Sequence, residues 1–548
     1  MKPRILWVNE CSVLTTGYAT YGREVLKRLH TSDKYTLAEH GAYISHQDPR
    51  AQQVPWVLYA NLPDPNSQDD VNRYNSNPAN QFGEWRFEDV CLDFKPHIVM
   101  DIRDFWMLSF EYRSPFRPYY NWVIQPTVDA YPQNEEWLST YKDADGVFTY
   151  QDWSKAILDH EGGGKINTLG AAPPAADVDF QPLNRQQLKE QLGFGNTQII
   201  GTIMRNQRRK LYPDLFASFC MFLNETKRDD IMLYCHTSYP DMGWDIPKLL
   251  LKLGLSSKVL FTYICKDCNH AFPNFFSDVL TTCPRCQKMS AGMASVQQGV
   301  DNKILSIILN TFDLYVQYAN SEGFGMPQLE AAACGTPVMS IDYSAMTDAV
   351  QKLEGISLPP LTLSMELETG CFRAVPDNDL FIEKLKEFFE LEPAVREQMR
   401  AKIRDNYVKN YNWDRTTQKW MSYFDTVNID HYEQLWHTPP KIYEPPTDYP
   451  KHLSNRDFAT WIILEVLREP RFLNTYMEAR LVRDLNYGVT SQGISGMYFN
   501  EMSSVSFQKP TWQEFNKETA FKHFVELRKR TNHWENRRWQ RIQETNNA

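Results

Sequence analysis

Short apolar stretches alternate with amphipathic stretches along most of this chain. The first apolar stretch, RILWVNE, is followed by a loop with Gly17 and by a helical pattern in which Leu26 and Leu29 share one face. Further strand-like runs lie at 97–102, 121–126 and 146–151. Apolar strands that alternate with helical segments predict a doubly wound α/β domain, here over residues 1–180.

A second series of the same kind follows a proline-rich passage near residues 171–195. Its apolar runs are TQIIGTIM, DIMLYCH, KVLFTYI, FDLYVQYA and TPVMSID. They predict a second Rossmann-like domain over residues 190–410, followed by a helix at 411–427. Two such domains in tandem, joined by a short connection, would face each other across a cleft.

Another proline-rich break, HTPPKIYEPPTDYP, separates this α/β region from the end of the chain. Residues 452–548 have a mostly helical pattern, with a Gly/Ser-rich interruption near 488–505. The last residues contain the stretch RKRTNHWENRRWQR, which is rich in arginine and tryptophan. We therefore expect a helical C-terminal extension beyond the two α/β domains.

Composition limits the class of protein. The chain has 548 residues and a formal net charge of −10, which argues against a protein whose whole surface binds nucleic acid but leaves local basic patches open. No stretch approaches the roughly 18 apolar residues of a membrane-spanning helix. The start, MKPRILWVNE, lacks the apolar core of a signal peptide, so we expect a soluble cytoplasmic protein.

The stretch NSEGFGMPQLEAAACGTP, at 320–337, carries the strongest chemical signal. Gly323 and Gly325 permit a tight turn, and Pro327 suits the first turn of the short helix that Gly335 would close. The free amides at such a helix start attract an anion, for example a diphosphate.

Two acids, Glu322 and Glu330, flank this turn. Helix side chains tilt toward the N-terminus, so Glu330 would point back to the anion site. A carboxylate repels phosphate but suits the neutral vicinal hydroxyls of a ribose, and Glu322 would suit the hydroxyls of a second sugar. The pattern predicts a nucleotide-diphosphate-sugar site; the alternative is a capped buried helix with two incidental surface acids.

The same stretch resembles the Glu-x7-Glu motif of GT-B glycosyltransferases of the family 4 type, which are retaining enzymes. The resemblance extends over about residues 3–427. The segment IIGTIMRNQRRK resembles the family's strand and the Arg and Lys that hold the donor diphosphate, which implies this role for Arg205 and Lys210. NTLGAAPPAADVDFQPL resembles the interdomain passage, and YNWDRTTQKW resembles the final helix, here 411–427, that crosses back to the N-terminal domain.

The resemblance implies an acceptor-binding N-terminal domain and a donor-binding C-terminal domain. It implies that Glu322 contacts the transferred sugar, that Glu330 contacts the ribose, and that Gly17 lies beneath the donor. The sugar and phosphate pocket would be lined by Gly323, Phe324, Gly325 and Met326. Without the resemblance, the residues around Gly17 would be interpreted as a routine strand-to-helix turn. His236, at the end of DIMLYCH, is equally well explained as a structural histidine or as a donor contact.

The chain departs from the family at one point, because many relatives have a histidine near the reacting sugar. The matching stretch here is VIQPTVDAYP, in which Asp129 takes the place of a polar active-site group. Asp129 would assist the acceptor hydroxyl or position the sugar, or be a plain turn residue. The identity of a general base stays open, and our hypothesis is a front-side route in which the leaving diphosphate takes the acceptor's proton. No catalytic metal is expected, since enzymes of this fold generally need none.

The cysteine pattern CKDC-(x14)-CPRC is the second strong signal. Two CxxC pairs at this separation predict a tetrahedral zinc site in a zinc-ribbon insertion over 261–292. Four thiolates leave no open position for water, so the zinc would be structural. Such a ribbon serves as a protein contact, a nucleic-acid module or a simple loop staple. The expected ligands are Cys265, Cys268, Cys283 and Cys286.

The sequence says least about the identity of the acceptor. The ribbon and the tail at 520–548, with Trp534 and Trp539, could form a basic, aromatic DNA-binding surface, although a solvated amphipathic tail explains the same residues. The arrangement also resembles glycosyltransferases of large bacteriophages. Our leading acceptor is therefore a hydroxymethylated base of phage DNA. The alternatives are a surface glycan or protein as acceptor, and a nucleic-acid-binding protein with a non-catalytic GT-B core.

Overall fold

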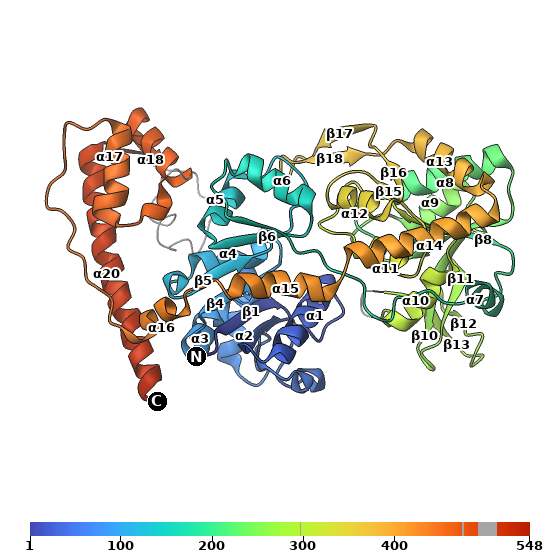
Figure 1. The fold of residues 1–548 in the computed structure, drawn as a ribbon, viewed down its shortest axis with the longest axis horizontal. Helices are drawn as coiled ribbons and strands as arrows, with labels where there is room; N and C mark the ends of the chain where they lie inside the picture. Colours follow the sequence, from blue (N-terminus) through green and yellow to red (C-terminus); the bar gives the residue numbers. More distant parts are fainter. Residues whose placement is uncertain (296–297, 474–475, 492–511) are drawn as a thin grey trace.

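The computed structural model describes residues 1–295, 298–473, 476–491 and 512–548. Two α/β domains lie side by side, and a helical lobe lies against the outer side of the first domain (Figure 1). Most of the Gly/Ser-rich interruption predicted near 488–505 falls outside the described residues.

The first domain contains a seven-stranded, all-parallel sheet in the order β3-β2-β1-β4-β5-β6-β7. Its strands are β1 (Arg4–Glu10), β2 (Thr36–Ala42), β3 (Val57–Ala60), β4 (Ile98–Asp101), β5 (Asn121–Ile124), β6 (Gly146–Thr149) and β7 (Thr168–Ala171). Its α-helices are α1 (Gly17–Ser32), α2 (Gln68–Asn75), α3 (Glu84–Phe94), α4 (Phe105–Arg113), α5 (Glu135–Asp143) and α6 (Asp152–Glu161), with 3-10 turns at Pro49–Gln53, Pro78–Phe82 and Arg117–Tyr119.

The second domain contains a nine-stranded sheet in which β8, β9, β10, β14, β15 and β16 are parallel and β11, β12 and β13 pair antiparallel at one end. The parallel strands are β8 (Gln198–Ile203), β9 (Ile231–His236), β10 (Val259–Cys265), β14 (Leu314–Gln317), β15 (Val338–Ile341) and β16 (Ile356–Leu358). The others are β11 (Ala271–Phe275), β12 (Thr281–Thr282) and β13 (Met289–Met293), and a separate hairpin joins β17 (Thr362–Met365) to β18 (Phe372–Val375).

The helices of this domain cover the sheet and then leave it. They are α7 (Arg185–Gln191), α8 (Tyr212–Thr226), α9 (Ile246–Leu253), α10 (Asn302–Thr311), α11 (Met326–Ala333), α12 (Ala345–Leu353), α13 (Asn378–Glu390), α14 (Pro393–Asn410) and α15 (Trp413–Phe424). The central strands β4, β5, β6, β14 and β15 are buried at every position. Because helices cover both faces of a parallel sheet, its strands appear in the sequence as continuous apolar runs.

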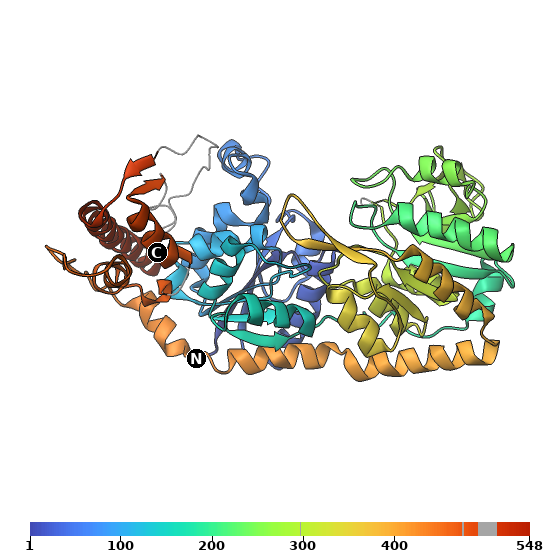
Figure 2. The ribbon, with the colours of Figure 1, turned by 90° about the horizontal axis from the view of Figure 1, so that it is seen from above.

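Helices α14 and α15 run along one side of both domains (Figure 2). The indole of Trp420 in α15 donates a hydrogen bond to the hydroxyl of Tyr21 in α1, at 2.9 Å. The ring of Trp413 meets the same tyrosine edge-on, with centroids 5.3 Å apart. Aromatic packing therefore attaches the end of the second domain to the first.

The C-terminal lobe has an apolar core of its own, formed by residues between Tyr449 and Leu527. It contains α16 (Ile429–His437), α17 (Asn455–Trp461), a π-helical turn at Ile462–Leu467, a 3-10 turn at Pro470–Phe472, α18 (Tyr476–Tyr487), β19 (Val489–Ser491), β20 (Trp512–Glu514) and α20 (Lys517–Asn547). Within the described parts of the chain, no helix is long and apolar enough to cross a membrane.

The far end of α20 packs on the first domain. Ile542 is buried in the same cluster as Trp436, and Trp539 packs against that cluster. Arg541 pairs with Glu88 at 2.8 Å and with Asp89 at 3.2 Å. The aromatic, basic tail thus contributes to the contact between the lobe and the first domain.

Candidate active site between the two domains

Two loops of the second domain meet at the carboxyl ends of β8 and β14. The backbone amide of Leu211 donates to the carbonyl of Tyr318 at 3.1 Å, and the amide of Asn320 donates to the carbonyl of Arg209 at 2.9 Å. Ligands of parallel α/β sheets bind at this end of the strands. The two predicted motifs, one after each strand, are therefore joined into one structure.

Lys210 and Glu322 form a buried ion pair across these loops. Both residues are 5% exposed. The amide of Gln317 donates to Glu322 Oε1 at 2.6 Å, and the backbone amide of Glu322 donates to the hydroxyl of Ser344 at 2.9 Å. Burial lowers the pKa of Lys210 well below its usual value, with the charge of Arg209 acting in the same direction.

The start of α11 follows directly. Gly325 has φ +77°, a left-handed conformation that favours glycine, and α11 begins at Met326, one residue before the expected Pro327. A Cβ on Gly323 would lie 2.3 Å from Thr127 Cγ2 in the first domain, and a Cβ on Gly17 would lie 3.9 Å from Met326 Sδ. The glycine turn is therefore pressed against the first domain and leaves no space for a side chain at position 323.

Arg205 lies at the other end of the cation-rich loop. Its guanidinium pairs with Asp241 through two hydrogen bonds of 2.9 and 3.0 Å. The side chain of Asp241 is 3% exposed, whereas that of Arg205 is 45% exposed. The bonds from Arg205 and Ser238 hold the pKa of Asp241 at about 2, against the effect of burial. The arginine is thus fixed at one face and open to solvent at the other.

Glu330 is the fifth of the eight residues of α11 and is partly buried. Burial raises the pKa of its carboxyl to about 7, and the charge of Asp177 contributes in the same direction. Its carboxyl group has no hydrogen-bond or ion-pair partner among the described residues. This group is therefore available to a hydroxyl-bearing ligand.

Asp129 of the first domain reaches the second domain through Arg373, in β18. The carboxylate pairs with that guanidinium at 2.8 Å and accepts a hydrogen bond from Ser321 at 3.2 Å. Arg373 also pairs with Glu366 at 2.8 Å. Asp129 is thus a neighbour of the residue before Glu322 and part of the junction between the domains.

The predicted residues are unevenly placed. The glycine turn, Lys210, Glu322, Gly17 and Asp129 lie around one junction. Phe324 also reaches the first domain, with its ring centroid 6.1 Å from that of Tyr150. His236 is engaged elsewhere, since its Nδ1 lies 2.8 Å from Thr262 Oγ1, and burial lowers its pKa to about 4.

Several residues around this junction were missed in the sequence. Asp104 follows β4 as Asp129 follows β5, and the rule that sites form at carboxyl ends of strands would have indicated it. Burial raises its pKa to about 6, against the effect of the neighbouring Thr127 and Tyr18. Gln317, Asp241 and Arg373 carried no local signal, because their partners lie in other elements.

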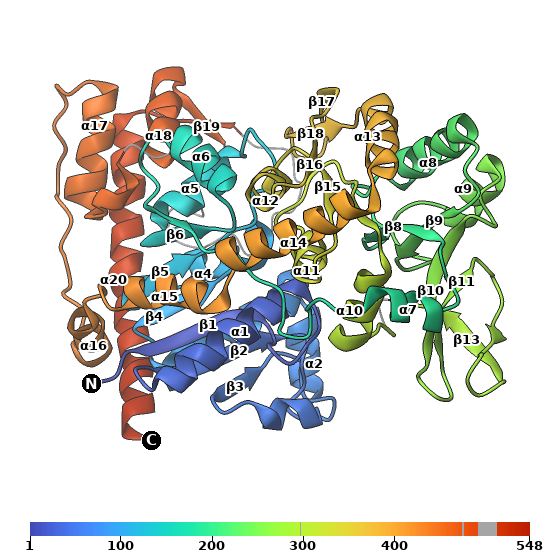
Figure 3. The same cartoon turned by 45° about the vertical axis from the view of Figure 1, so that its right-hand side comes forward.

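The four cysteines of the predicted metal site come together at the edge of the second sheet. Their sulfur atoms lie within 4.8 Å of one another, with Cys265 and Cys286 at 3.5 Å and Cys268 and Cys283 at 3.7 Å. Thiolates at about 2.3 Å from a tetrahedral zinc ion are about 3.8 Å apart, so the cluster fits this metal. Figure 3 shows the cysteine-bearing strands at the end of the sheet distant from the first domain.

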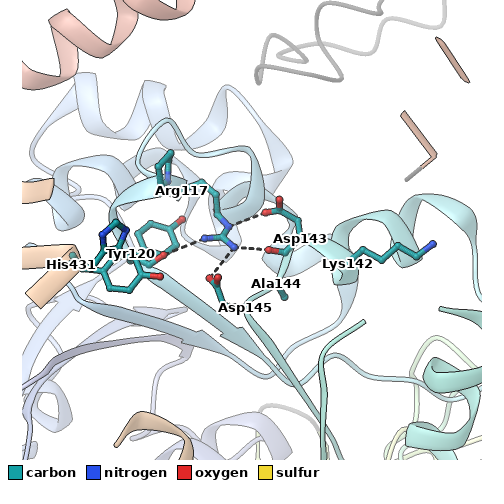
Figure 4. A pocket seen from close by; sticks show the side chains of 9 residues that line it. Arg117, Tyr120, Lys142, Asp143, Ala144, Asp145 and His431 are labelled. Atoms are coloured by element: carbon teal, nitrogen blue, oxygen red, sulfur yellow. Dashed lines mark hydrogen bonds and ion pairs between the residues drawn. The ribbon is translucent and has the colours of Figure 1, made fainter. Parts of the chain in front are cut away.

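A separate pocket of about 330 Å³ lies between α5 and α16, near the amino ends of β5 and β6. Arg117 lies at its centre and is paired with Asp143 at 2.9 Å and Asp145 at 3.0 Å, while Lys142 extends away from it (Figure 4). The guanidinium of Arg117 is already neutralised by these two aspartates. The pocket also lies at the end of the sheet opposite to the junction. It therefore joins α16 to the first domain and is not part of the site.

Part of the second domain matches a known family model. Residues 291–406, which include Glu322 and Glu330, match the family model described as glycosyl transferases group 1. The comparison with curated protein sequences gave no match.

Solved structures are similar over both α/β domains. A sucrose-phosphate synthase from Thermosynechococcus elongatus is 15% identical, with a TM-score of 0.54 over 78% of this chain and 99% of its own. The HepE protein of Anabaena, in complex with UDP and glucose, is 12% identical, with a TM-score of 0.53 over 78% and 100%. A glycosyltransferase from Rickettsia africae is 13% identical, with a TM-score of 0.52 over 78% and 98%. The predicted fold is thereby confirmed: the chain has the two-domain GT-B fold, with a helical C-terminal region.

Proposed function

We propose that the protein is a retaining glycosyltransferase that moves a sugar from a nucleotide-diphosphate-sugar to an acceptor hydroxyl. The buried pair of Lys210 and Glu322 beside the start of α11 carries this proposal. Where the two loops meet, it combines a cation for a diphosphate, a carboxylate for sugar hydroxyls and a helix N-terminus. The match of residues 291–406 to a glycosyltransferase family model supports it further.

In this proposal the second domain binds the donor. Arg205, Lys210 and the amides at the start of α11 hold the diphosphate. Glu322 accepts hydrogen bonds from the transferred sugar, and Glu330 accepts them from the ribose. The open face of Arg205 and the unpaired carboxyl of Glu330 support these roles, because each has free hydrogen-bonding capacity.

Catalysis would then be mainly electrostatic. Negative charge develops on the departing diphosphate, and preorganised cations and amides stabilise it without reorganisation. The leaving phosphate oxygen takes the proton of the acceptor hydroxyl on the same face of the sugar as the new bond forms, so configuration is retained. Asp129 positions the reacting groups by holding the first domain to Arg373 and Ser321.

We assign only a structural role to the metal. The four cysteines would hold it with no position left for water, at a distance along the sheet from the junction. Zinc at this point would fold the ribbon and supply no chemistry to the reaction.

For the acceptor we propose a hydroxymethylated base in DNA, with a phage-encoded enzyme acting in the host cytoplasm. Exposed Lys266 and Arg285 on the ribbon support a nucleic-acid contact. The tail supports it less than the sequence suggested, because Arg538 and Arg541 are paired with acids. A surface glycan or a protein is the alternative acceptor.

The test combines donors and acceptors. Purified protein is incubated with UDP-, GDP-, ADP- and CMP-sugars, with and without DNA that contains 5-hydroxymethylcytosine, and released nucleotide and nucleoside masses are measured. The proposal predicts release from one donor, and a hexose- or pentose-sized gain on the modified base. Release without any gain on DNA moves the acceptor to a glycan or protein; inversion at the product's anomeric carbon would contradict retention.

A further inference from the structure

A loop of the second domain, residues 237–245, holds the cation loop, residues 205–210, at both ends. Asp241 fixes Arg205 through two hydrogen bonds, and the indole of Trp244 donates to the carbonyl of Lys210 at 2.7 Å. Between these ends, Asn206 and the backbone of Trp244 exchange two hydrogen bonds of 2.8 Å. We call residues 237–245 the clamp loop.

The ring of Phe276 connects the cysteine ribbon to the clamp loop. The ring of Phe276, directly after β11, lies 5.7 Å from the ring of Tyr239 and 6.0 Å from that of Phe261 in β10. The next residue, Ser277, donates its amide to the hydroxyl of Tyr263 at 2.7 Å. Phe276 thus lies between the ribbon and the loop that positions the two donor-site cations.

β10 connects this contact to the metal ligands. It belongs to the parallel sheet through β9, pairs with both β11 and β13 of the ribbon, and ends at Cys265. β11 has no fully buried residue, and beside the cysteines the described part of the ribbon core contains only Ala291 and the partly buried Phe272. Phe272, Phe276 and Met293 pack in addition against the core of the second domain, and bound metal would add stability to the small core around the cysteines.

We propose that the four-cysteine metal site braces the donor site, by holding Phe276 against Tyr239 and so keeping the clamp loop on the cation loop. Loss of the metal frees the end of β11, Phe276 leaves Tyr239, and Arg205 and Lys210 lose their fixed backbone. Tyr239, Asp241, Trp244 and Phe276 act as positioning residues. The ligand in this inference is the diphosphate of the proposed function; the mechanical link between ribbon and clamp loop stands independently of it.

The test uses the full-length, metal-loaded protein and neighbouring phenylalanines. Phe276→Ala removes the contact, and Phe276→Leu keeps an apolar side chain there. Phe275→Ala is the matched control, because Phe275 is 37% exposed and belongs to the same strand end. Hydrogen–deuterium exchange of residues 205–210 and 237–245, the dissociation constant for UDP and the bound zinc are measured for each variant, and for wild type after chelation.

The inference predicts that Phe276→Ala retains its zinc, exchanges faster in both loops and binds UDP about fivefold or more weakly. Chelation of wild type should give the same result, and should add little to the Phe276→Ala variant. Phe276→Leu should restore most of the loss, and Phe275→Ala should match wild type. Unchanged exchange in the clamp loop after chelation or in Phe276→Ala overturns the inference. Absence of UDP binding by wild type, repeated with GDP and ADP, would count against the proposed function, and exchange alone would then decide the link.

Discussion

Lys210 and Glu322, which are 112 positions apart in the sequence, form an ion pair inside the second domain. Each lies in the loop after a different parallel strand, β8 or β14, and the pair joins these two loops. A diphosphate that enters this site meets a cation already in place. The position of this cation, Lys210, depends on Glu322, the carboxylate that we assign to the sugar.

The contribution of this ion pair to the free energy of unfolding can be measured separately from its proposed role in catalysis. Lys210→Met leaves Glu322 buried without its cation, and we expect a loss of about 3 kcal/mol in the free energy of unfolding. The double variant with Glu322→Gln removes both charges and should recover most of that loss. Urea unfolding at neutral pH measures both. A double variant as unstable as the sum of its single variants would show that the two charges are not coupled.

Arg205 and Arg208 offer a comparison within one loop. Arg205→Ala should weaken UDP binding about 10- to 100-fold, because a charge-assisted hydrogen bond contributes about 1.5–3 kcal/mol. Arg208 is exposed and has no ion-pair partner among the described residues, so Arg208→Ala should change affinity by less than about twofold. Calorimetric titration of both variants checks this, and equal losses would exclude a specific role for Arg205.

The pKa of Glu330 predicts a pH dependence of nucleotide binding. Ribose hydroxyls donate to the ionised carboxylate, which forms as the pH rises through about 7. UDP affinity of wild type should therefore fall up to about tenfold from about pH 8 to about pH 6. Glu330→Gln should bind weakly with a flat profile, and a sloping profile in this variant would assign the titration to another group.

Ionisation of Glu330 should strengthen nucleotide binding but lower the stability of the folded protein. A carboxyl whose pKa is raised by folding favours the folded state at low pH, and that contribution is lost as the pH rises from its unfolded value through about 7. Glu330→Gln should thus be more stable than wild type above about pH 7, by about 1–3 kcal/mol. Chemical denaturation as a function of pH measures this, and a variant less stable than wild type at high pH would contradict it.

Metal removal should destabilise the ribbon. Cys286→Ser is expected to lose the zinc and to lower the melting temperature of the second domain, since metal binding contributes to folding. Cys220→Ser serves as the control, because this thiol lies in α8, donates to the carbonyl of Leu253 in α9 and accepts from Asn224 of its own helix, away from the cysteine cluster. Zinc stoichiometry and calorimetry together provide the check, and a Cys286→Ser protein that keeps one zinc per chain would refute the four-cysteine assignment.

Sequence patterns predicted the parts of the site better than their connections. Glu322, Glu330, Lys210 and the four cysteines could be proposed as site residues because each belongs to a short motif with local chemistry. Arg373 was not, since its role depends on a hairpin that carries it to Asp129 in the other domain. Such pairings are non-local, and neither periodicity nor spacing encodes them.

The fold shows the same division. Apolar runs predicted the parallel strands of both sheets, because strands buried on both faces have a strong local signal. The ribbon was expected as an insertion, but β10 is shared: it pairs with β9 of the main sheet at Val259–Phe261 and ends at the metal-site residue Cys265. The packing of α20 on the first domain was missed for a related reason: its arginines appear solvated in sequence, whereas Arg541 pairs with acids more than 400 positions earlier.

Release of nucleoside diphosphate from sugar nucleotides by wild type and by Glu322→Gln tests the central claim most directly. Glu368→Gln, an exposed carboxylate of the same domain, is the control. Our account predicts release by wild type and by the control, with a loss of about 100-fold or more in Glu322→Gln. No release from any donor, or equal release by wild type and Glu322→Gln, would contradict it.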